Sequence, residues 1–185
     1  MPIQFGTDGW RGIIADDFTF ENVRYCAQGF SDYILTQNLA NKGLIIGYDT
    51  RFLSEDFANT VAEVSAGNGI KTLLSDRPVP TPVVSYNVLF HGTGGGVVIT
   101  ASHNPPQWNG FKFKPEYAGS ASPEIVDALE THVRSSETRK FNKHVRWEQA
   151  ISQNIGSLID PSLPYLQHVS NLVDIDEIRN FGLRI

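Results

Sequence analysis

Residues 96–106, GVVITASHNPP, join a short apolar run to a polar loop that two prolines close. The run at 96–100 has the length and β-branched content of a buried strand, and similar runs occupy residues 44–48 and 70–74. Helical patterns lie between them, and after residue 54 apolar side chains recur at three- and four-residue intervals. This alternation predicts an α/β domain with a largely parallel sheet.

A fourth strand is expected at residues 111–114, where two phenylalanines alternate with two lysines. Because only a loop connects it to the strand at 96–100, we expect the two strands to be antiparallel. Further helices are expected over residues 19–36, 81–90 and 122–133. The sequence thus predicts a three-layer α/β/α domain around a mixed, largely parallel four-stranded sheet.

The last quarter of the chain has a different character. Residues 137–164 are polar and punctuated by proline, which suits a connector, and residues 165–180 have a helical pattern. A strand-like run begins at residues 182–185, where the sequence stops. We therefore expect residues 1–140 to form one domain, and residues 141–185 to be a connector helix and the truncated start of a further unit.

Composition and charge narrow the class of protein. The 185 residues are 41% hydrophobic and 19% charged, which is ordinary for a globular domain and excludes disorder, collagen and coiled coil. The net charge of −5 argues against a general nucleic-acid binder, which would need a basic surplus. No apolar run approaches the roughly 20 residues of a membrane span, and the N-terminus shows no signal peptide. We expect a cytoplasmic protein with neither nucleic acid nor membrane as partner.

Several common kinds of site are excluded. The single cysteine, Cys26, rules out an internal disulfide framework and a cysteine-based metal cluster, and it falls on an apolar helical stripe that suits a core thiol. The sequence has no Walker A loop and no Gly-x-Ser-x-Gly elbow. Residues 174–179, DIDEIR, form two-thirds of an aspartate-rich metal loop, with Ile178 in the third place. We expect a solvated acidic helix face there, with Ile175 and Ile178 turned inward.

The loop after residue 100 has the strongest chemical signal, because open α/β sheets bind ligands at the carboxyl ends of their strands. Ser102 and His103 are neighbours whose side chains usually diverge, which disfavours an ordinary Ser–His nucleophile–base pair. Ser102 is instead a candidate phosphate carrier, since a phosphoserine holds about −1.5 to −2 charges and needs cations nearby. The cations available are Arg11, Arg51, Lys112 and Lys114, the last of them by default a solvated lysine.

Three blocks resemble, in order and spacing, the first domain of the α-D-phosphohexomutases, the phosphoglucomutase/phosphomannomutase family. They are residues 5–12 (FGTDGWRG), residues 47–51 (GYDTR) and residues 100–112, in which TASHNPP is followed by NGFK. The resemblance covers roughly residues 1–140. The connector and the strand-like run after it resemble the start of the family's second domain.

The resemblance implies roles for the matched residues. Ser102 is similar to the family's phosphoserine, whose phosphate also offers an oxygen to Mg²⁺. Arg11, His103 and Lys112 resemble the catalytic groups beside it. The positions that resemble substrate- or phosphate-binding residues are Thr7, Arg51, Asn104 and Asn109.

Each role has a structural alternative. Arg11 could pair with Asp8 or stack, and Arg51 could brace the loop through Asp49. In the same way, a histidine beside the serine is often a loop histidine with its hydrogen bonds satisfied. Lys112 is expected to be partly exposed, so that its replacement would affect turnover far more than folding.

The family's reaction implies an intramolecular phosphotransferase that interconverts hexose 1-phosphate and hexose 6-phosphate, of glucose or mannose. It runs through a phosphoserine and a hexose 1,6-bisphosphate, and it needs Mg²⁺ that is also held by the second domain. Because the remaining family domains are not matched, we expect this chain alone to be inactive. Two alternatives stay open: a phosphosugar- or partner-binding module without turnover and, with less support, a serine esterase.

Overall fold

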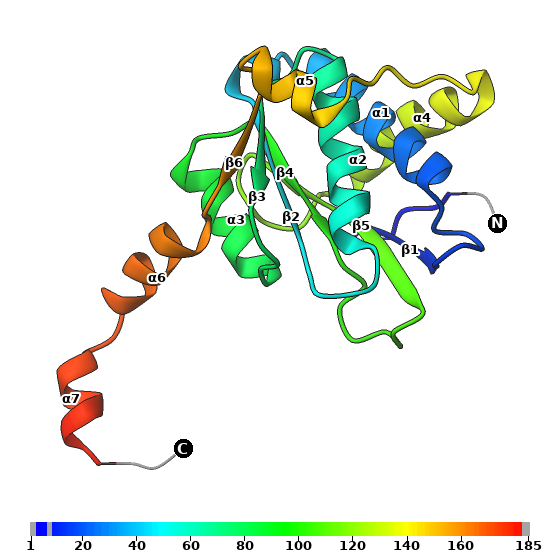
Figure 1. Ribbon diagram of the computed structural model, residues 1–185. Helices are drawn as coiled ribbons and strands as arrows, with labels where there is room; N and C mark the ends of the chain where they lie inside the picture. Colours follow the sequence, from blue (N-terminus) through cyan, green and yellow to red (C-terminus); the bar gives the residue numbers. More distant parts are fainter. Residues whose placement is uncertain (1–2, 7–8, 183–185) are drawn as a thin grey trace.

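The computed structural model describes residues 3–6 and 9–182, and it has a central sheet with helices on both faces (Figure 1). This part of the chain contributes six strands, in the order β1-β5-β4-β2-β3-β6. They are β1 (Trp10–Ile13), β2 (Leu44–Tyr48), β3 (Thr72–Ser75), β4 (Gly95–Ile99), β5 (Trp108–Pro115) and β6 (Gly156–Ile159). The predicted α/β/α class is confirmed, but the sheet has two strands more than the four expected.

Two layers of helices enclose the sheet. One face packs against α1 (Phe20–Thr36), α2 (Ser54–Gly67), α4 (Pro123–Arg139) and α5 (Trp147–Ser152). The other face packs against α3 (Thr81–Phe90) and α6 (Ser162–Ser170). A 3₁₀ turn (Ala40–Lys42) precedes β2, and α7 (Ile175–Asn180) follows α6. Both faces of the inner strands are therefore buried, as is usual for a largely parallel sheet.

The order of the strands reverses in the middle of the sheet. The chain passes from β2 through α2 to β3 on one side, and it returns through α3 to β4 on the other side of β2. β2 is parallel to both neighbours, whereas β5 is antiparallel to β4, as predicted, and β1 is antiparallel to β5. Such a reversal leaves a crevice beyond the carboxyl ends of the two strands, here β2 and β4.

The larger core lies between the sheet and α1, α2 and α4. Its fully buried side chains include Phe18, Phe30, Phe57 and Phe111, and Phe18 stacks on Trp10 at 4.9 Å between ring centroids. Cys26 is also fully buried there, and burial raises the pKa of its thiol well above the ordinary value. The interpretation of Cys26 as a core thiol is confirmed.

The segment expected to be a polar connector takes part in the sheet. Within residues 137–164 the chain forms α5 and then β6, which pairs in parallel with β3. The prediction of a connector was wrong here because the short GSLI run of β6 offers little apolar pattern, and an edge strand needs little. Of the strand expected at 182–185, residues 183–185 lie outside the described part of the chain.

The end of the described chain, α7, leads away from the sheet (Figure 1). Asp174 caps α7 by accepting a hydrogen bond from the amide of Glu177 at 2.9 Å. Ile175 and Ile178 are 37% and 57% exposed, so the expectation that they turn inward was wrong, because the core does not reach this helix. None of the described helices is long and apolar enough to cross a membrane.

Candidate active site

Two loops border the crevice at the strand reversal. One follows β2 and spans residues 49–53, and the other follows β4 and spans residues 100–107. The amide of Asp49 donates to the carbonyl of Ile99 at 3.1 Å, which extends the β2–β4 pairing up to the crevice. The blocks at residues 47–51 and 100–112 belong to this region or to the strands β2 and β5, and residues 10–12 of the first block belong to β1.

Ser102 stands exposed on the second loop in a left-handed backbone conformation, with φ 58°. Its amide donates to Thr100 Oγ1 at 3.1 Å, and the amide of Asn104 donates to the carbonyl of Ala101 at 3.1 Å. A left-handed non-glycine residue is unusual and persists where its surroundings enforce it. The loop therefore presents the Ser102 hydroxyl in a conformation that the rest of the site must maintain.

His103 lies beside Ser102 without forming a close pair. The distance from Ser102 Oγ to His103 Nδ1 is 3.4 Å, which is long for a hydrogen bond. Both side chains are exposed. This geometry gives little support to the esterase alternative, which needs a base aligned on the hydroxyl.

Arg51 reaches from the first loop under the second. Its Nη1 donates to the carbonyls of Pro105 at 2.9 Å and Trp108 at 3.1 Å, and its Nη2 donates to those of Ser102 and Asn104, both at 2.7 Å. Its Nε lies 3.2 Å from Asp49 Oδ2. The guanidinium was expected to bind substrate or phosphate, but the geometry favours the bracing role that the sequence left open.

Asn109 also has a structural position. It is fully buried, its side-chain NH₂ donates to Ser54 Oγ at 2.9 Å, and its side-chain oxygen accepts from the amide of Gly110 at 2.9 Å. Ser54 Oγ in turn donates to Asp49 Oδ1 at 2.7 Å. Asn109, expected to contact substrate, thus belongs to a buried chain of hydrogen bonds that ends on the partner of Arg51.

Sequence reasoning did not select Asp49, Ser54 or Thr100 as site residues. The signal for Asp49 was its place in the GYDTR block two residues before Arg51. The signal for Ser54 was its place at the start of a helix, but its hydroxyl bonds Asp49, whereas the cap position of α2 belongs to Leu53.

Ser102 lines two open hollows. The first, of about 480 Å³, is lined by Asp49, Thr50, Arg51, Phe52, Ser102, Asn104 and Pro106. The second, of about 400 Å³, is lined by Asp49, Val79, Pro80, Thr81, Pro82, Thr100, Ser102 and His103. The second includes the first residues of α3, where the helix dipole favours an anion. A phosphoryl group on Ser102 would thus have space in either hollow.

Arg11 and Lys112 approach from the strands next to β4. Arg11 lies opposite Gly110, and the carbonyl of Gly110 accepts from the amide of Thr100 at 3.0 Å. Lys112 shares the sheet face of Gly110 and lies opposite Val98. The strand register therefore places Arg11 in the row of paired residues nearest the Ser102 loop, which contains Gly110 and Thr100. Lys112 lies in the next row on the same sheet face, two residues further from the loop.

The expected exposure of the two lysines on β5 needs correction, and the expectation for Thr7 falls outside the described residues. Lys112 is only 5% exposed and Lys114 7%, so the expectation of partly exposed lysines was wrong, because both faces of β5 are covered. Thr7 lies outside the described residues. Gly110 keeps the row open, because a Cβ at this position would come within 3.1 Å of Arg11 Cγ and 2.7 Å of the Thr100 carbonyl.

Tyr48 ends β2 next to the crevice and is 3% exposed. Burial, with a smaller contribution from the Glu55 carboxylate, raises the pKa of Tyr48 to about 12. The phenol therefore keeps its proton at neutral pH. It adds no negative charge beside the loop where a phosphoryl anion would sit.

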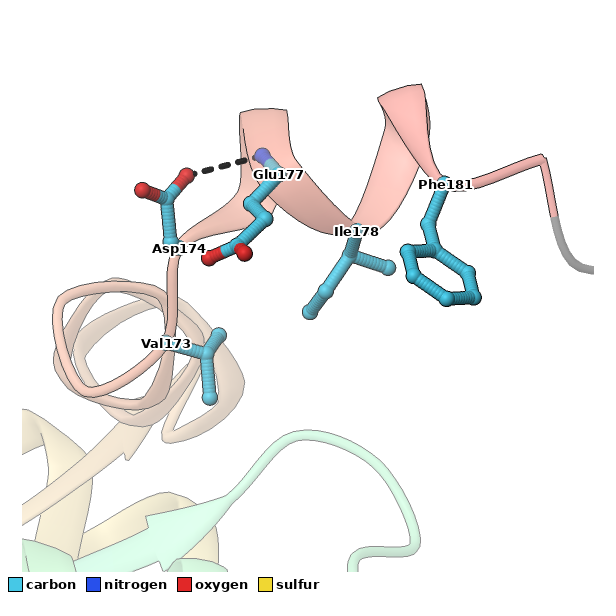
Figure 2. A pocket seen from close by; sticks show the side chains of 5 residues that line it. All are labelled: Val173, Asp174, Glu177, Ile178 and Phe181. Carbon is cyan, nitrogen blue, oxygen red and sulfur yellow. Dashed lines mark hydrogen bonds between the residues drawn. The ribbon is translucent and has the colours of Figure 1, made fainter.

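A hollow of about 430 Å³ lies at the other end of the described chain, lined by Val173, Asp174, Glu177, Ile178 and Phe181 (Figure 2). The only hydrogen bond drawn among these residues is the cap from Glu177 to Asp174. Across the described residues there is no group of three or more His, Cys, Asp or Glu side chains that could hold a metal ion. The DIDEIR run therefore forms a capped helix start.

Comparison with known proteins identifies the family of this chain. Residues 2–140 match the family described as "Phosphoglucomutase/phosphomannomutase, alpha/beta/alpha domain I". A phosphoglucomutase of Komagataeibacter xylinus is 32% identical over 194 residues, which cover 99% of this chain and 35% of that protein. A probable phosphoribomutase of Schizosaccharomyces pombe is 43% identical over 115 residues, which cover 60% of this chain and 20% of that protein.

Among solved structures, a putative phosphomannomutase of Thermus thermophilus matches with a TM-score of 0.81 at 33% identity, over 95% of this chain and 37% of that one. This chain spans about a third of the length of the K. xylinus and T. thermophilus proteins. The family match includes β1, the Arg51 loop, the Ser102 loop and β5. The chain belongs to the phosphoglucomutase/phosphomannomutase family, as its α/β/α domain I.

Proposed function

We propose that this chain is the phosphoserine domain of a phosphohexomutase, which interconverts the 1- and 6-phosphates of glucose or mannose through a hexose 1,6-bisphosphate. The observation that supports this most directly is the presentation of Ser102. Its loop stands at the reversal of the strand order, and Ser102 itself is exposed and lines two hollows. The family match is consistent with the proposal.

In the proposed reaction, phosphorylated Ser102 gives its phosphoryl group to a sugar hydroxyl. The bond between phosphorus and Ser102 Oγ breaks, the sugar oxygen forms the new bond to phosphorus, and the proton of the sugar hydroxyl passes to a base. Ser102 Oγ recovers a proton. After the bisphosphate reorients, the other phosphate returns to Ser102 by the same steps in reverse, which restores the phosphoenzyme.

Phosphoryl transfer is chiefly positioning and stabilisation of charge on the phosphoryl oxygens. We assign charge stabilisation to Arg11 and Lys112, whose strand positions lie beside the Ser102 loop. Arg11 can fork two donors onto the phosphoryl oxygens, and Lys112 supplies a compact charge. Lys112 is also the group proposed to handle the proton, and His103 stays a candidate for polar contact with the transferred group.

Magnesium has an incomplete set of ligands in the described residues. Mg²⁺ favours near-octahedral oxygen ligation, and no carboxylate cluster of three or more stands in this part of the chain. Asp49 lines both hollows with Ser102, but its oxygens already bond Arg51 and Ser54. These residues alone do not fit a Mg²⁺ site, so no step above runs through the ion. That the phosphate of Ser102 gives Mg²⁺ one oxygen stays a prediction.

The domain limits and the partners also stay predictions. The family match ends at residue 140, whereas β6 and α6 pack on the same sheet and helices. We propose that the complete protein binds its phosphosugar between this domain and the remaining family domains. The hexose assignment is tested against pentose phosphates as well, because a relative is called a probable phosphoribomutase.

The proposal is tested by phosphoryl labelling in the complete reading frame that contains this chain. Incubation with glucose 1,6-bisphosphate labelled in both phosphates should label one site, and peptide mass mapping should place the label on Ser102. Ser102→Ala should remove the label and the turnover. Ser135→Ala, an exposed serine on α4, is the matched control and should keep both. A label retained by Ser102→Ala would refute the assignment.

The binding-module alternative makes a different prediction for the same assay, namely phosphosugar binding without turnover in any length of the chain. For the mutase, we expect the 185-residue chain to fold but to show no turnover with glucose 1-phosphate, Mg²⁺ and a trace of bisphosphate, because its described residues do not provide a full set of metal ligands. Turnover close to that of the complete enzyme, after a check for host contamination, would contradict this account of the metal.

A further inference from the structure

The two terminal nitrogens of Arg51 donate four hydrogen bonds to the loop that carries Ser102 and to the first residue of β5. A guanidinium has five N–H donors in a fixed plane. Two on Nη1 and two on Nη2 reach four carbonyls, and Nε faces Asp49. Because these bonds are 2.7–3.2 Å long, Arg51 could bind a phosphoryl group only by releasing the loop.

The converging carbonyls explain why the loop needs a cation. The carbonyls of residues 102, 104, 105 and 108 point at one place, although nothing in a regular turn requires this. Carbonyl oxygens repel one another unless a donor or a cation lies between them, and charge-assisted hydrogen bonds are among the strongest. The loop between β4 and β5 is therefore built around the guanidinium.

Arg51 is itself held from behind. Asp49 Oδ2 lies 3.2 Å from Arg51 Nε, and Asp49 Oδ1 accepts from the Arg51 amide at 3.0 Å and from Ser54 Oγ at 2.7 Å. Asn109 on β5 completes the chain through Ser54. The orientation of the guanidinium is thus fixed by the start of α2 and by the first residues of β5, which are both parts of the regular fold.

We infer that Arg51 is the positioning residue of the Ser102 loop. Its guanidinium holds Ser102, which lines both hollows, in its left-handed conformation, and it acts through the backbone rather than on the phosphate. The effect on turnover rests on the proposed function, but the effect on loop order does not. The fork matters more than the charge, because an ammonium cannot reach four carbonyls in one plane.

The experiment compares Arg51→Lys with Arg77→Lys. Arg77, which follows β3, also forms ion pairs, with Asp76 and with Asp160 after β6. Neither partner belongs to the Ser102 loop. Amide hydrogen exchange in the 185-residue chain is read at Ser102, Asn104 and Trp108. The internal reference is the set of amides of β4. In the complete enzyme, kcat and KM for glucose 1-phosphate are measured separately.

In Arg51→Lys we expect exchange at the three loop amides to rise by more than about tenfold, because charge-assisted hydrogen bonds are lost there, while the β4 amides change little. In the complete enzyme kcat should fall on the order of 10²-fold with KM almost unchanged, as for a displaced reacting group. Arg77→Lys should leave both readings at the wild-type level.

The inference is overturned if Arg51→Lys leaves the loop amides protected, whatever the turnover does. It is also overturned if KM rises at constant kcat, because that result would make Arg51 a substrate ligand. Loop exchange that rises in a protein without mutase turnover would refute the proposed function and leave the positioning role intact. If Arg51→Lys does not fold, Asp49→Asn should give the same pattern more weakly, and normal loop exchange in that variant would refute the inference.

Discussion

Two hollows of similar size differ in the residues that line them. The one beside Ser102 has about 480 Å³ and the one beside α7 about 430 Å³. The first is lined by two loops about fifty residues apart in sequence, joined by hydrogen bonds from Arg51. The second is lined by residues 173–181 alone, and its apolar side chains are largely exposed (Figure 2). Convergence of distant polar groups, rather than volume, distinguishes a site from a surface irregularity.

The largest difference between the two regions should appear in the rate. Lys112→Met removes a buried cation to which the proposed mechanism assigns charge stabilisation, and loss of one such group costs on the order of 10²–10³ in turnover. Lys114→Met is the matched control, since Lys114 is on the same strand and face but one row further from the loop, opposite Gly96. Both variants are assayed for turnover in the complete enzyme and for melting temperature.

Equal losses of turnover in the two lysine variants would contradict the prediction, because they would show that distance from the Ser102 loop does not matter. Unchanged turnover with a lowered melting temperature in Lys112→Met would make Lys112 a structural residue. Because Lys112 is buried, its replacement can also destabilise the fold, so the melting temperature of the variant must be measured whether or not turnover is lost.

A smaller effect is expected from the hydrogen-bond chain behind the site. Asn109→Ala leaves the buried hydroxyl of Ser54 and the amide of Gly110 without their present partner. An unsatisfied buried polar group costs about 1–3 kcal/mol, so the free energy of unfolding in urea should fall by that amount. Asn41→Ala, at an exposed position before β2, serves as the control. Wild-type stability in Asn109→Ala would show that the hydrogen bonds from Asn109 through Ser54 to Asp49 do not support the loop.

The smallest effect should come from the other hollow. Ile178 and Phe181 are 57% and 73% exposed, so Ile178→Ser and Phe181→Ser should change the free energy of unfolding of the 185-residue chain by less than about 0.5 kcal/mol. Denaturant titration of each variant tests this. A loss of stability comparable to that of Asn109→Ala would mean that the two hollows are supported alike.

The sequence predicted the inner part of the fold because its signals are local. The strands at 44–48, 70–74 and 96–100 are apolar runs between helical patterns, and the structure has strands in each place within two residues. β1 and β6 were not predicted, because four-residue edge strands such as WRGI and GSLI have almost no period of their own. Only the neighbouring strand makes them strands.

The position of the candidate site could be predicted from its motifs, but which of its residues support the loop and which face the open site could not. The sequence marked Ser102 and the cations, but it placed Asn109 among the groups that contact substrate and left Arg51 open between that role and bracing the loop. Which donors are already used is a property of the tertiary structure, since Arg51 and its carbonyl acceptors are more than fifty residues apart. Burial of Lys112 was missed for a similar reason: alternation of Phe and Lys is typical of a half-exposed strand, and here both faces are covered.

The pairing of β1 has a consequence for synthesis on the ribosome. In the described part of the chain β1 pairs with β5 alone, and Arg11 lies opposite Gly110, about a hundred residues later. At about 5–20 residues per second, β1 waits roughly 5–20 seconds before its partner strand has been made. β2, β3 and β4 can pair with one another before then. Arg11 can therefore take its place at the candidate active site only after β5 has been made, although it is synthesised before every other described residue of that site.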